Sequence, residues 1–172
     1  ASLAYHDYEG IALNEDEIEK LSVEPGWSDE GRTVPRTSVA RDLTAAERIW
    51  RNVGPGTTHV IDAAAVNTLM RLVKALDCAE WFFFDGHNAE QKKTMGFAED
   101  HGKGATVTVF VELTDRNGPQ THGTAQHLLV GHPVDEEKSA YFCRWKGDGQ
   151  WPWAFTLPAD VVRQLMKPLT RP

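Results

Sequence analysis

The sequence predicts an α+β fold, in which an antiparallel sheet of about five strands has helices packed on one face. Helical patterns come first along the chain, and strand-like patterns dominate its later half. Most links between the later strands are shorter than the dozen residues that a parallel crossover needs, which favours antiparallel pairing. The 172 residues fit one such domain, and the apolar fraction of 41% is usual for a soluble globular protein.

An acidic segment precedes this domain. Residues 1–31 hold nine carboxylates and one lysine, a balance of −8, whereas the whole chain carries −7. We therefore expect residues 1–43 to form an acidic, partly irregular N-terminal arm and residues 44–172 to form a single α+β domain. Within the arm, Asn14 predicts the cap of a short helix from about Glu15 to Leu21, which Pro25-Gly26 ends.

Two further helices are expected before the sheet. Thr44-Ala45-Ala46-Glu47 has the form of a capping box and predicts a helix to about Val53. Asp62 opens the strongest helical pattern, which runs to about Ala79 and which we expect to lie on the sheet. Its apolar stripe consists of Val66, Leu69, Met70, Val73 and Leu76.

The strand patterns begin with Trp81–Phe84, which is apolar throughout, as a central strand would be. A short helix is expected over Asn88–Met95. Residues 105–113 alternate apolar and polar side chains, which predicts a half-buried strand, and His127–Gly131 reads as the next strand.

A hairpin and a helix complete the fold. Tyr141–Trp145 and Trp151–Leu157 flank the turn Gly147-Asp148-Gly149. Because Pro152 cannot donate a ladder hydrogen bond, we expect the second strand at an edge of the sheet. Pro158 suits the first turn of a closing helix, whose apolar stripe contains Val161, Val162, Leu165, Met166 and Leu169.

Histidines supply one candidate metal site. Five of the seven fall between residues 87 and 132, and His122, His127 and His132 follow one another at intervals of five. Zinc or iron needs two or three such ligands around one point. Residues five apart on a straight strand face opposite sides, so this site requires a bend in the strand. The alternative is that these histidines are satisfied by water or backbone.

Asp85 and His87 form a second candidate site, because they directly follow the apolar strand Trp81–Phe84. The carboxylate can orient the imidazole for acid–base catalysis, and we take Asp85, His87 and His122 as candidate catalytic residues. Glu112 can join them only if both groups lie at the same end of the sheet. The alternative is an ordinary Asp-Gly turn.

The stretch Thr121-His122-Gly123-Thr124 is similar to the one that carries the general base in subtilisin-like serine proteases. That family also needs a Gly-Thr-Ser-x-Ala nucleophile stretch and a much longer chain. Both are missing, so we discard the resemblance.

Aromatic residues of the hairpin supply a candidate ligand-binding face. Tyr141, Trp145, Trp151 and Trp153 would form a flat surface for a planar ligand or a protein partner if they are exposed. The alternative is that this face packs under the helices.

Composition excludes several functions. The acidic balance argues against nucleic-acid binding, and no apolar run approaches the roughly 20 residues that span a membrane. No phosphate-binding glycine loop, Gly-x-Ser-x-Gly elbow or Cys-x-x-Cys pair is present, so no motif identifies a cofactor. Cys78 and Cys143 are expected as free thiols in the cytoplasm, or as one disulfide.

Two functions follow from these patterns. The preferred one is a non-catalytic binding module that engages a protein partner or a planar ligand through the acidic arm and the aromatic face. The alternative is a small enzyme of hydrolase or oxygenase type that uses the His/Asp cluster, with or without a metal. We prefer the first because no spacing in the sequence defines a catalytic geometry.

Overall fold

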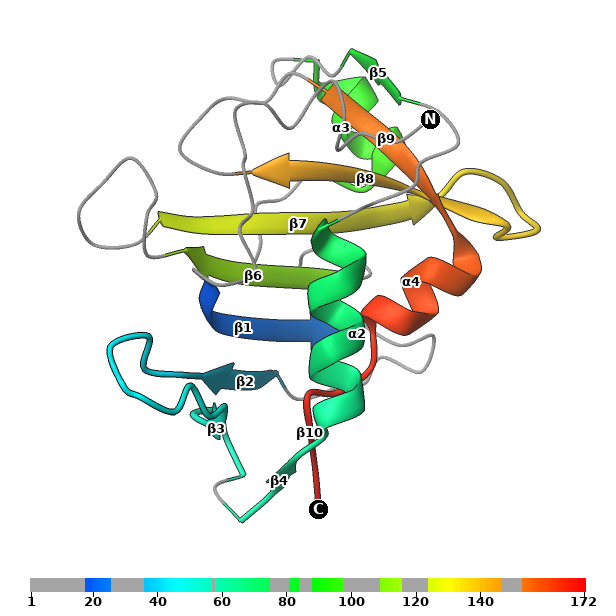
Figure 1. Ribbon diagram of the computed structural model, residues 1–172. Helices are drawn as coiled ribbons and strands as arrows, with labels where there is room; N and C mark the ends of the chain where they lie inside the picture. Colours follow the sequence, from blue (N-terminus) through cyan, green and yellow to red (C-terminus); the bar gives the residue numbers. More distant parts are fainter. Residues whose placement is uncertain are drawn as a thin grey trace.

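One eight-stranded antiparallel sheet organises the protein (Figure 1). The computed structural model describes residues 18–25, 36–56, 58–74, 81–83, 88–97, 109–115, 124–146 and 153–172. The strands follow the order β3-β2-β1-β6-β7-β8-β9-β5. Their bounds are β1 Ile18–Pro25, β2 Thr37–Ala40, β3 Arg51–Asn52, β5 Trp81–Phe83, β6 Val109–Asp115, β7 Thr124–Pro133, β8 Ala140–Lys146 and β9 Trp153–Pro158.

The α+β class is thus confirmed, but the expected number of about five strands is too low. The five strands predicted from apolar patterns are present as β5 to β9. Parts of three predicted strands, residues 84, 105–108 and 151–152, lie outside the described residues. The additional strands are β1, β2 and β3, which sequence patterns did not reveal. A separate short pair joins β4 (Val60–Ile61) to β10 (Thr170–Arg171) near the C-terminus.

The prediction of a short helix from about Glu15 to Leu21 is wrong for residues 18–21, the part of that segment that the structure describes. Ile18–Pro25 is β1, paired with β2 on one side and β6 on the other, in the interior of the sheet. Leu21 and Val23 are buried in the core and Ser22 faces the opposite way, which is the alternation of a strand. The part of the expected arm that the structure describes therefore belongs to the same sheet as the rest, while residues 1–17 and 26–35 lie outside it.

The helix expected after Thr44 is also wrong, since residues 41–50 form turns and irregular chain. The side chain of Asp42 accepts hydrogen bonds from the backbone N–H of Thr44 at 2.8 Å and from its hydroxyl at 2.6 Å. The threonine hydroxyl is therefore engaged in a local turn and does not cap a helix.

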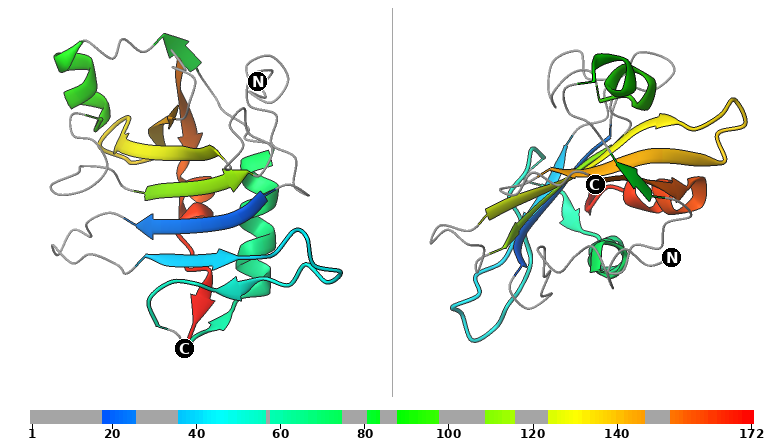
Figure 2. Two further views of the ribbon diagram at one scale, coloured as in Figure 1. Left: turned by 90° about the vertical axis from the view of Figure 1, so that its left-hand side faces the viewer. Right: turned by 90° about the horizontal axis from the view of Figure 1, so that it is seen from above.

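Helices cover both faces of the sheet (Figure 2). On one face lie α2 (Ala63–Lys74), begun by a 3.1 Å bond from the Ala65 N–H to the Asp62 side chain, and α4 (Ala159–Leu165). They cover the main core, which is formed by Ile18, Leu21, Val23, Val39, Val66, Leu69, Met70, Val73, Leu128, Val130, Cys143, Trp145, Phe155, Leu157, Val162, Leu165 and Leu169. The predicted stripe of the long helix is thereby confirmed from Val66 to Val73; residues 75–80 are outside the described part.

The opposite face carries α3 (Ala89–Met95), so the expectation of helices on a single face is wrong. Asn88 caps α3 through its side chain, and Gly96 ends it with a positive φ of 86°. The cause of the error is a small second apolar cluster, made by Met95, Phe97, Leu129 and Ala154, which gives this short helix its own contact with the sheet.

Two expectations about sheet edges are wrong as well. β5, expected at the centre, lies at one end of the sheet and pairs only with β9 among the described strands. β9, expected at an edge, pairs with both β8 and β5. An apolar run predicts burial of side chains but not strand order. Pro152, on which the edge position of β9 was based, lies outside the described residues, and β9 as described begins at Trp153.

The described helices include none that is long and apolar enough to cross a membrane.

Candidate functional site

A row of polar residues crosses five neighbouring strands of the sheet. The register pairs Ser38 of β2 with Ser22 of β1, and Ser22 with Glu112 of β6. It then pairs Glu112 with His127 of β7, and His127 with Lys146 of β8. Residues directly opposite one another in antiparallel strands belong to the same face, with Cα atoms about 4.5–5.5 Å apart. We call Ser38, Ser22, Glu112, His127 and Lys146 the polar row.

The polar row lies on the face that carries α3. Ser22 alternates with Leu21 and Val23, which both belong to the main core on the other face. Farther along the row, on β7, His127 is two residues from Leu129, which packs in the apolar cluster beneath α3. Two residues along a strand share a face, so the row and α3 lie on the same side.

The two serines at one end of the polar row are not accessible to solvent. Ser22 and Ser38 are buried, and their hydroxyl oxygens form a 2.8 Å hydrogen bond with each other. Two strand spacings, about 9.5 Å, separate Ser22 from His127. The imidazole therefore cannot take a proton directly from the Ser22 hydroxyl, and a serine nucleophile activated by His127 is excluded at this position.

The histidine end of the row is more accessible and basic. His127 is half-buried, and Arg144, two residues before Lys146 on β8, is half-buried as well. The Arg144 guanidinium lies over the ring of Phe97, just beyond α3, with 5.9 Å between its carbon and the ring centroid. Three basic residues on two adjacent strands thus share the face that carries α3, and Arg144 is the one whose guanidinium reaches the Phe97 ring.

The predicted metal ligands are only partly placed. His127 and His132 both lie in β7, and the strand register shifts between Val130 and Pro133, which supplies an irregularity of the kind that the metal hypothesis required. His122 lies outside the described residues. Within the described part of the chain, no three His, Cys, Asp or Glu residues come together as metal ligands.

The predicted catalytic residues Asp85, His87 and His122 all lie outside the described residues. Glu112, which we considered as their companion, instead has His127 as its cross-strand neighbour. This pairing was missed because it joins residues of two strands whose register no local pattern reveals.

The aromatic face is only partly available for binding. Trp145 is completely buried in the main core, and Tyr141 is half-buried against that core. Trp151 lies outside the described residues, and for Trp153 the structure describes only the backbone. The Trp145 ring therefore has no surface on which a ligand can stack.

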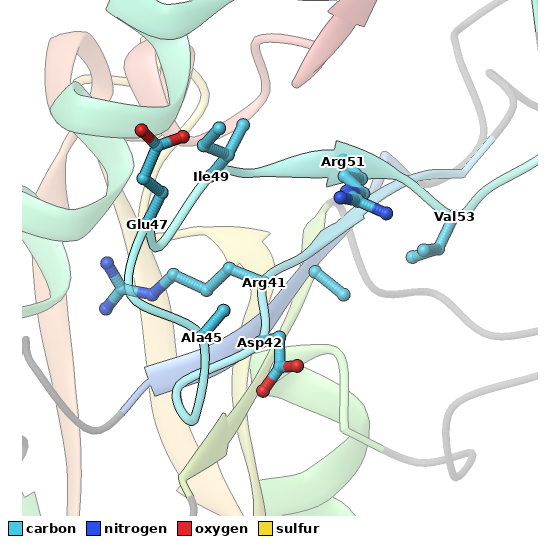
Figure 3. Close-up of a pocket in the computed structure, with 8 residues that line it drawn as sticks. Arg41, Asp42, Ala45, Glu47, Ile49, Arg51 and Val53 are labelled. Atoms are coloured by element: carbon cyan, nitrogen blue, oxygen red, sulfur yellow. The ribbon is translucent and has the colours of Figure 1, made fainter.

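A second surface lies at the β3 end of the sheet, where the chain between β2 and β3 encloses an open cavity of about 300 Å³ (Figure 3). One arm of this loop carries Arg41 and Asp42, and the other returns through Glu47 and Ile49 to β3. Arg41 is held at the base by a 2.8 Å bond from its Nε to the Ile18 carbonyl and by stacking on Trp50 at 4.5 Å. The lining residues are Ala40, Arg41, Asp42, Ala45, Glu47, Ile49, Arg51 and Val53.

Apolar side chains are exposed at this cavity and on β4, which contacts β3. In the cavity lining Ile49 is 56% exposed and Val53 is 53% exposed, and Val60 of β4 is 53% exposed. We call Ile49, Arg51, Val53 and Val60 the loop surface. Sequence reasoning missed it because the apparent capping box assigned residues 45–53 to a helix. The signal that could have revealed it is the alternation Ile49-x-Arg51-x-Val53, which is typical of a strand.

Comparison of the chain with known protein families, curated proteins and solved structures finds no match. The two surfaces described above are therefore the features of the molecule that point to a function. The loop surface offers exposed apolar side chains at one end of the sheet, and the polar row offers charged residues beside α3.

Proposed function

We propose that this chain is a non-catalytic binding module that engages a protein partner through the loop surface. The functional class is the one expected from the sequence, but the contact surface differs. The observation that carries the proposal is the exposure of Ile49 and Val53 on the lining of one cavity, with Val60 exposed on β4 nearby. Exposed apolar side chains that gather in one place are characteristic of interaction sites.

The position of the loop surface favours an extended partner segment. β3 is the last strand of the sheet and pairs only with β2 among the described strands. An extended peptide can add to such an edge through main-chain hydrogen bonds, while alternate side chains enter neighbouring pockets. Ile49 and Val53 flank β3 and line the cavity that would receive those side chains.

Charge favours an acidic segment. The chain from Arg41 to Val53 contains three basic residues, Arg41, Arg48 and Arg51, against two acidic ones. Of these, Arg48 and Arg51 are exposed. Complementary charge raises the association rate and the specificity of binding, so the favoured partner segment carries carboxylates. Its apolar side chains would contact Ile49 and Val53.

Selection from a displayed library of random peptides tests the proposal. We expect the protein to enrich acidic peptides with apolar side chains, and the double variant Ile49→Ser, Val53→Ser to bind them at least about tenfold more weakly. Val134→Ser is the matched control, because Val134 is 44% exposed in the turn between β7 and β8. Peptides that bind the double variant as tightly as the unaltered protein would refute the proposal.

The acidic arm is proposed as a further contact, with a basic region of the partner that is separate from the acidic segment at the loop surface. The truncation that tests this contact must leave β1 in place. Removal of residues 1–31 would delete β1 and unfold the sheet, so only residues 1–17 can be removed. A binding module that uses the arm should lose partner affinity on this truncation, whereas an enzyme should keep its turnover. The buried free thiol of Cys143 supports the proposed cytoplasmic location.

The alternative function, a small enzyme, is favoured by one observation. The register of β6 and β7 makes Glu112 the cross-strand neighbour of His127, and glutamate and histidine are residue types that act in general acid–base catalysis. Hydrolysis of activated esters by the unaltered protein and by His127→Asn tests this alternative. Equal rates for the two proteins would exclude His127 as a general base in that reaction.

A further inference from the structure

We propose that residues 11–17 of this chain dock on its own loop surface and occupy it until a partner segment displaces them. The inference deepens the proposed function and rests on it, since it takes the loop surface to be a site for acidic segments that carry apolar side chains. Three observations support it: the position where β1 begins, the complementary charges, and the spacing of apolar residues.

β1 begins beside the cavity of the loop surface. The carbonyl of its first residue, Ile18, accepts the 2.8 Å hydrogen bond from Arg41 Nε, and the Glu19 carbonyl accepts a 2.9 Å bond from the Arg41 backbone N–H. Arg41 lines the cavity together with Ile49 and Arg51 (Figure 3). The chain that precedes Ile18 therefore joins the sheet next to this cavity.

Only a few residues are needed to reach β3 from the start of β1. β2 lies between β1 and β3, so two strand spacings, about 9.5 Å, separate β1 from β3. About three residues of extended chain cover this distance. Residues 14–17 can thus connect the two strands, and residues 11–13 can lie along β3.

The charges of the segment and of the surface are complementary. Residues 1–17 contain five carboxylates, three of them directly before β1, and no Lys or Arg. The register places Lys20 of β1 opposite Ala40 of β2, and Ala40 opposite Arg51 of β3, so the two basic residues belong to the same face. Arg51 is exposed and Lys20 is half-buried. An acidic segment of the kind that the loop surface favours is therefore present in the chain itself.

Two acidic residues also line the cavity, but their side chains point away from Arg51 (Figure 3). They are Asp42 and Glu47. The Asp42 carboxylate accepts hydrogen bonds from the N–H and the hydroxyl of Thr44. The positive charge of Arg51 thus lies on the strand along which the segment would dock.

Apolar residues of the segment and of the surface match in type and spacing. Ile11 and Leu13 are two positions apart, so their side chains share one side of an extended segment. Ile49 and Val53 flank β3 and are 56% and 53% exposed. Removal of these four side chains from water favours docking, and a segment that lies along β3 can also bond to the edge of the sheet.

Docking within one chain makes the segment a competitor of the partner. Attachment through a few residues gives an effective concentration of about 1 mM. If the separate segment binds with a dissociation constant of about 0.1 mM, the docked form exceeds the open form about tenfold, and the apparent affinity for any other segment falls by the same factor. A partner that overcomes this competition releases residues 1–17 for the contact with its basic region.

Binding of a synthetic peptide of residues 1–17 to the full chain tests the proposal. The double variant Ile11→Ser, Leu13→Ser removes the apolar contacts of the docked segment and leaves the loop surface unaltered. We expect the peptide to bind this variant with a dissociation constant of about 0.1 mM and the unaltered protein about tenfold more weakly. Amide shifts of residues 49–53 in NMR spectra measure both affinities.

Leu3→Ser is the matched control, because Leu3 is an apolar residue of the same acidic arm but lies outside residues 11–17. Its affinity for the peptide should stay within about twofold of the unaltered protein. Equal affinities of the double variant and the unaltered protein would overturn the proposal. So would the absence of saturable binding to the double variant at about 1 mM peptide.

Dilution distinguishes docking within one chain from docking between two copies. The amide shifts of residues 49–53 in the unaltered protein should not change on dilution by about tenfold, because the effective concentration within one chain is constant. Shifts that change on dilution would overturn the proposal and indicate that the segment binds a second copy.

Failure of this proposal differs from failure of the proposed function. If library peptides bind the loop surface but the peptide of residues 1–17 does not, only the docking of this segment is refuted. If library peptides bind the double variant Ile49→Ser, Val53→Ser as tightly as the unaltered protein, the proposed function fails, whatever the result with the peptide of residues 1–17.

Discussion

Two threonine hydroxyls, that of Thr37 in β2 and that of Thr170 in β10, have contrasting environments. The Thr37 hydroxyl oxygen accepts a 2.9 Å hydrogen bond from the Leu169 N–H, which ties the end of the chain to β2. The Thr170 hydroxyl is buried and has no hydrogen-bond partner among the described residues. A buried polar group without a partner costs free energy, whereas a paired one is neutral or stabilising. The two hydroxyls should therefore contribute to stability with opposite signs.

We expect Thr170→Val to keep the free energy of unfolding or to raise it by up to about 1 kcal/mol. Thr37→Val should lower it by about 1–2 kcal/mol, because the Leu169 N–H loses its acceptor. Urea unfolding monitored by circular dichroism measures both values. A larger loss for Thr170→Val than for Thr37→Val would show that these environments are assigned wrongly.

Trp145 tests the interpretation of the aromatic residues. It is completely buried in the main core, whereas Trp50 is half-buried and packs against that core from outside. Trp145→Ala should lower the free energy of unfolding by about 3–5 kcal/mol, and Trp50→Ala should lower it by less. If Trp145→Ala costs less than Trp50→Ala in the same denaturation experiment, the ring is not in the core and the binding role expected from the sequence regains support.

At the scale of elements, two helices were predicted wrongly because the local sequence pattern is compatible with more than one structure. The segment Ile18–Val23 fits both a helical stripe and a strand, and its pairing with β2 and β6 decides for the strand. The capping-box pattern at Thr44 failed because Asp42, two residues earlier, engages the threonine. By contrast, α2, α3 and α4 occur where they were expected, although α4 ends at Leu165, before the predicted stripe residue Leu169. For α2 and α4 the sequence combines a capping or proline signal with an apolar stripe.

Gly131 determines how α3 meets the sheet. A Cβ atom at this position would run into the Met95 carbonyl oxygen and lie 3.0 Å from the Phe97 ring. Gly131→Ala should therefore push the end of α3 away from β7 and lower the free energy of unfolding by about 1–3 kcal/mol. Hydrogen exchange should accelerate most at amides 89–97. Unchanged exchange and stability would contradict this packing.

At the scale of the whole molecule, local patterns predicted the α+β class but not the sheet. Periodicity identified β5 to β9 because it depends on neighbours in sequence. Strand order and register depend on contacts between distant segments, so the positions of β1 and β5 could not be predicted. His127 was a candidate from its residue type alone, whereas its neighbours Glu112 and Lys146 became visible only through the register.

The sheet register is the central claim, because it creates the polar row and leaves β3 at one end of the sheet. Nuclear Overhauser contacts between backbone protons measure it most directly. We expect interstrand contacts between residues 22 and 112, 112 and 127, and 127 and 146. Helical contacts across residues 15–21, together with no contact between residues 22 and 112, would contradict the fold and both proposals.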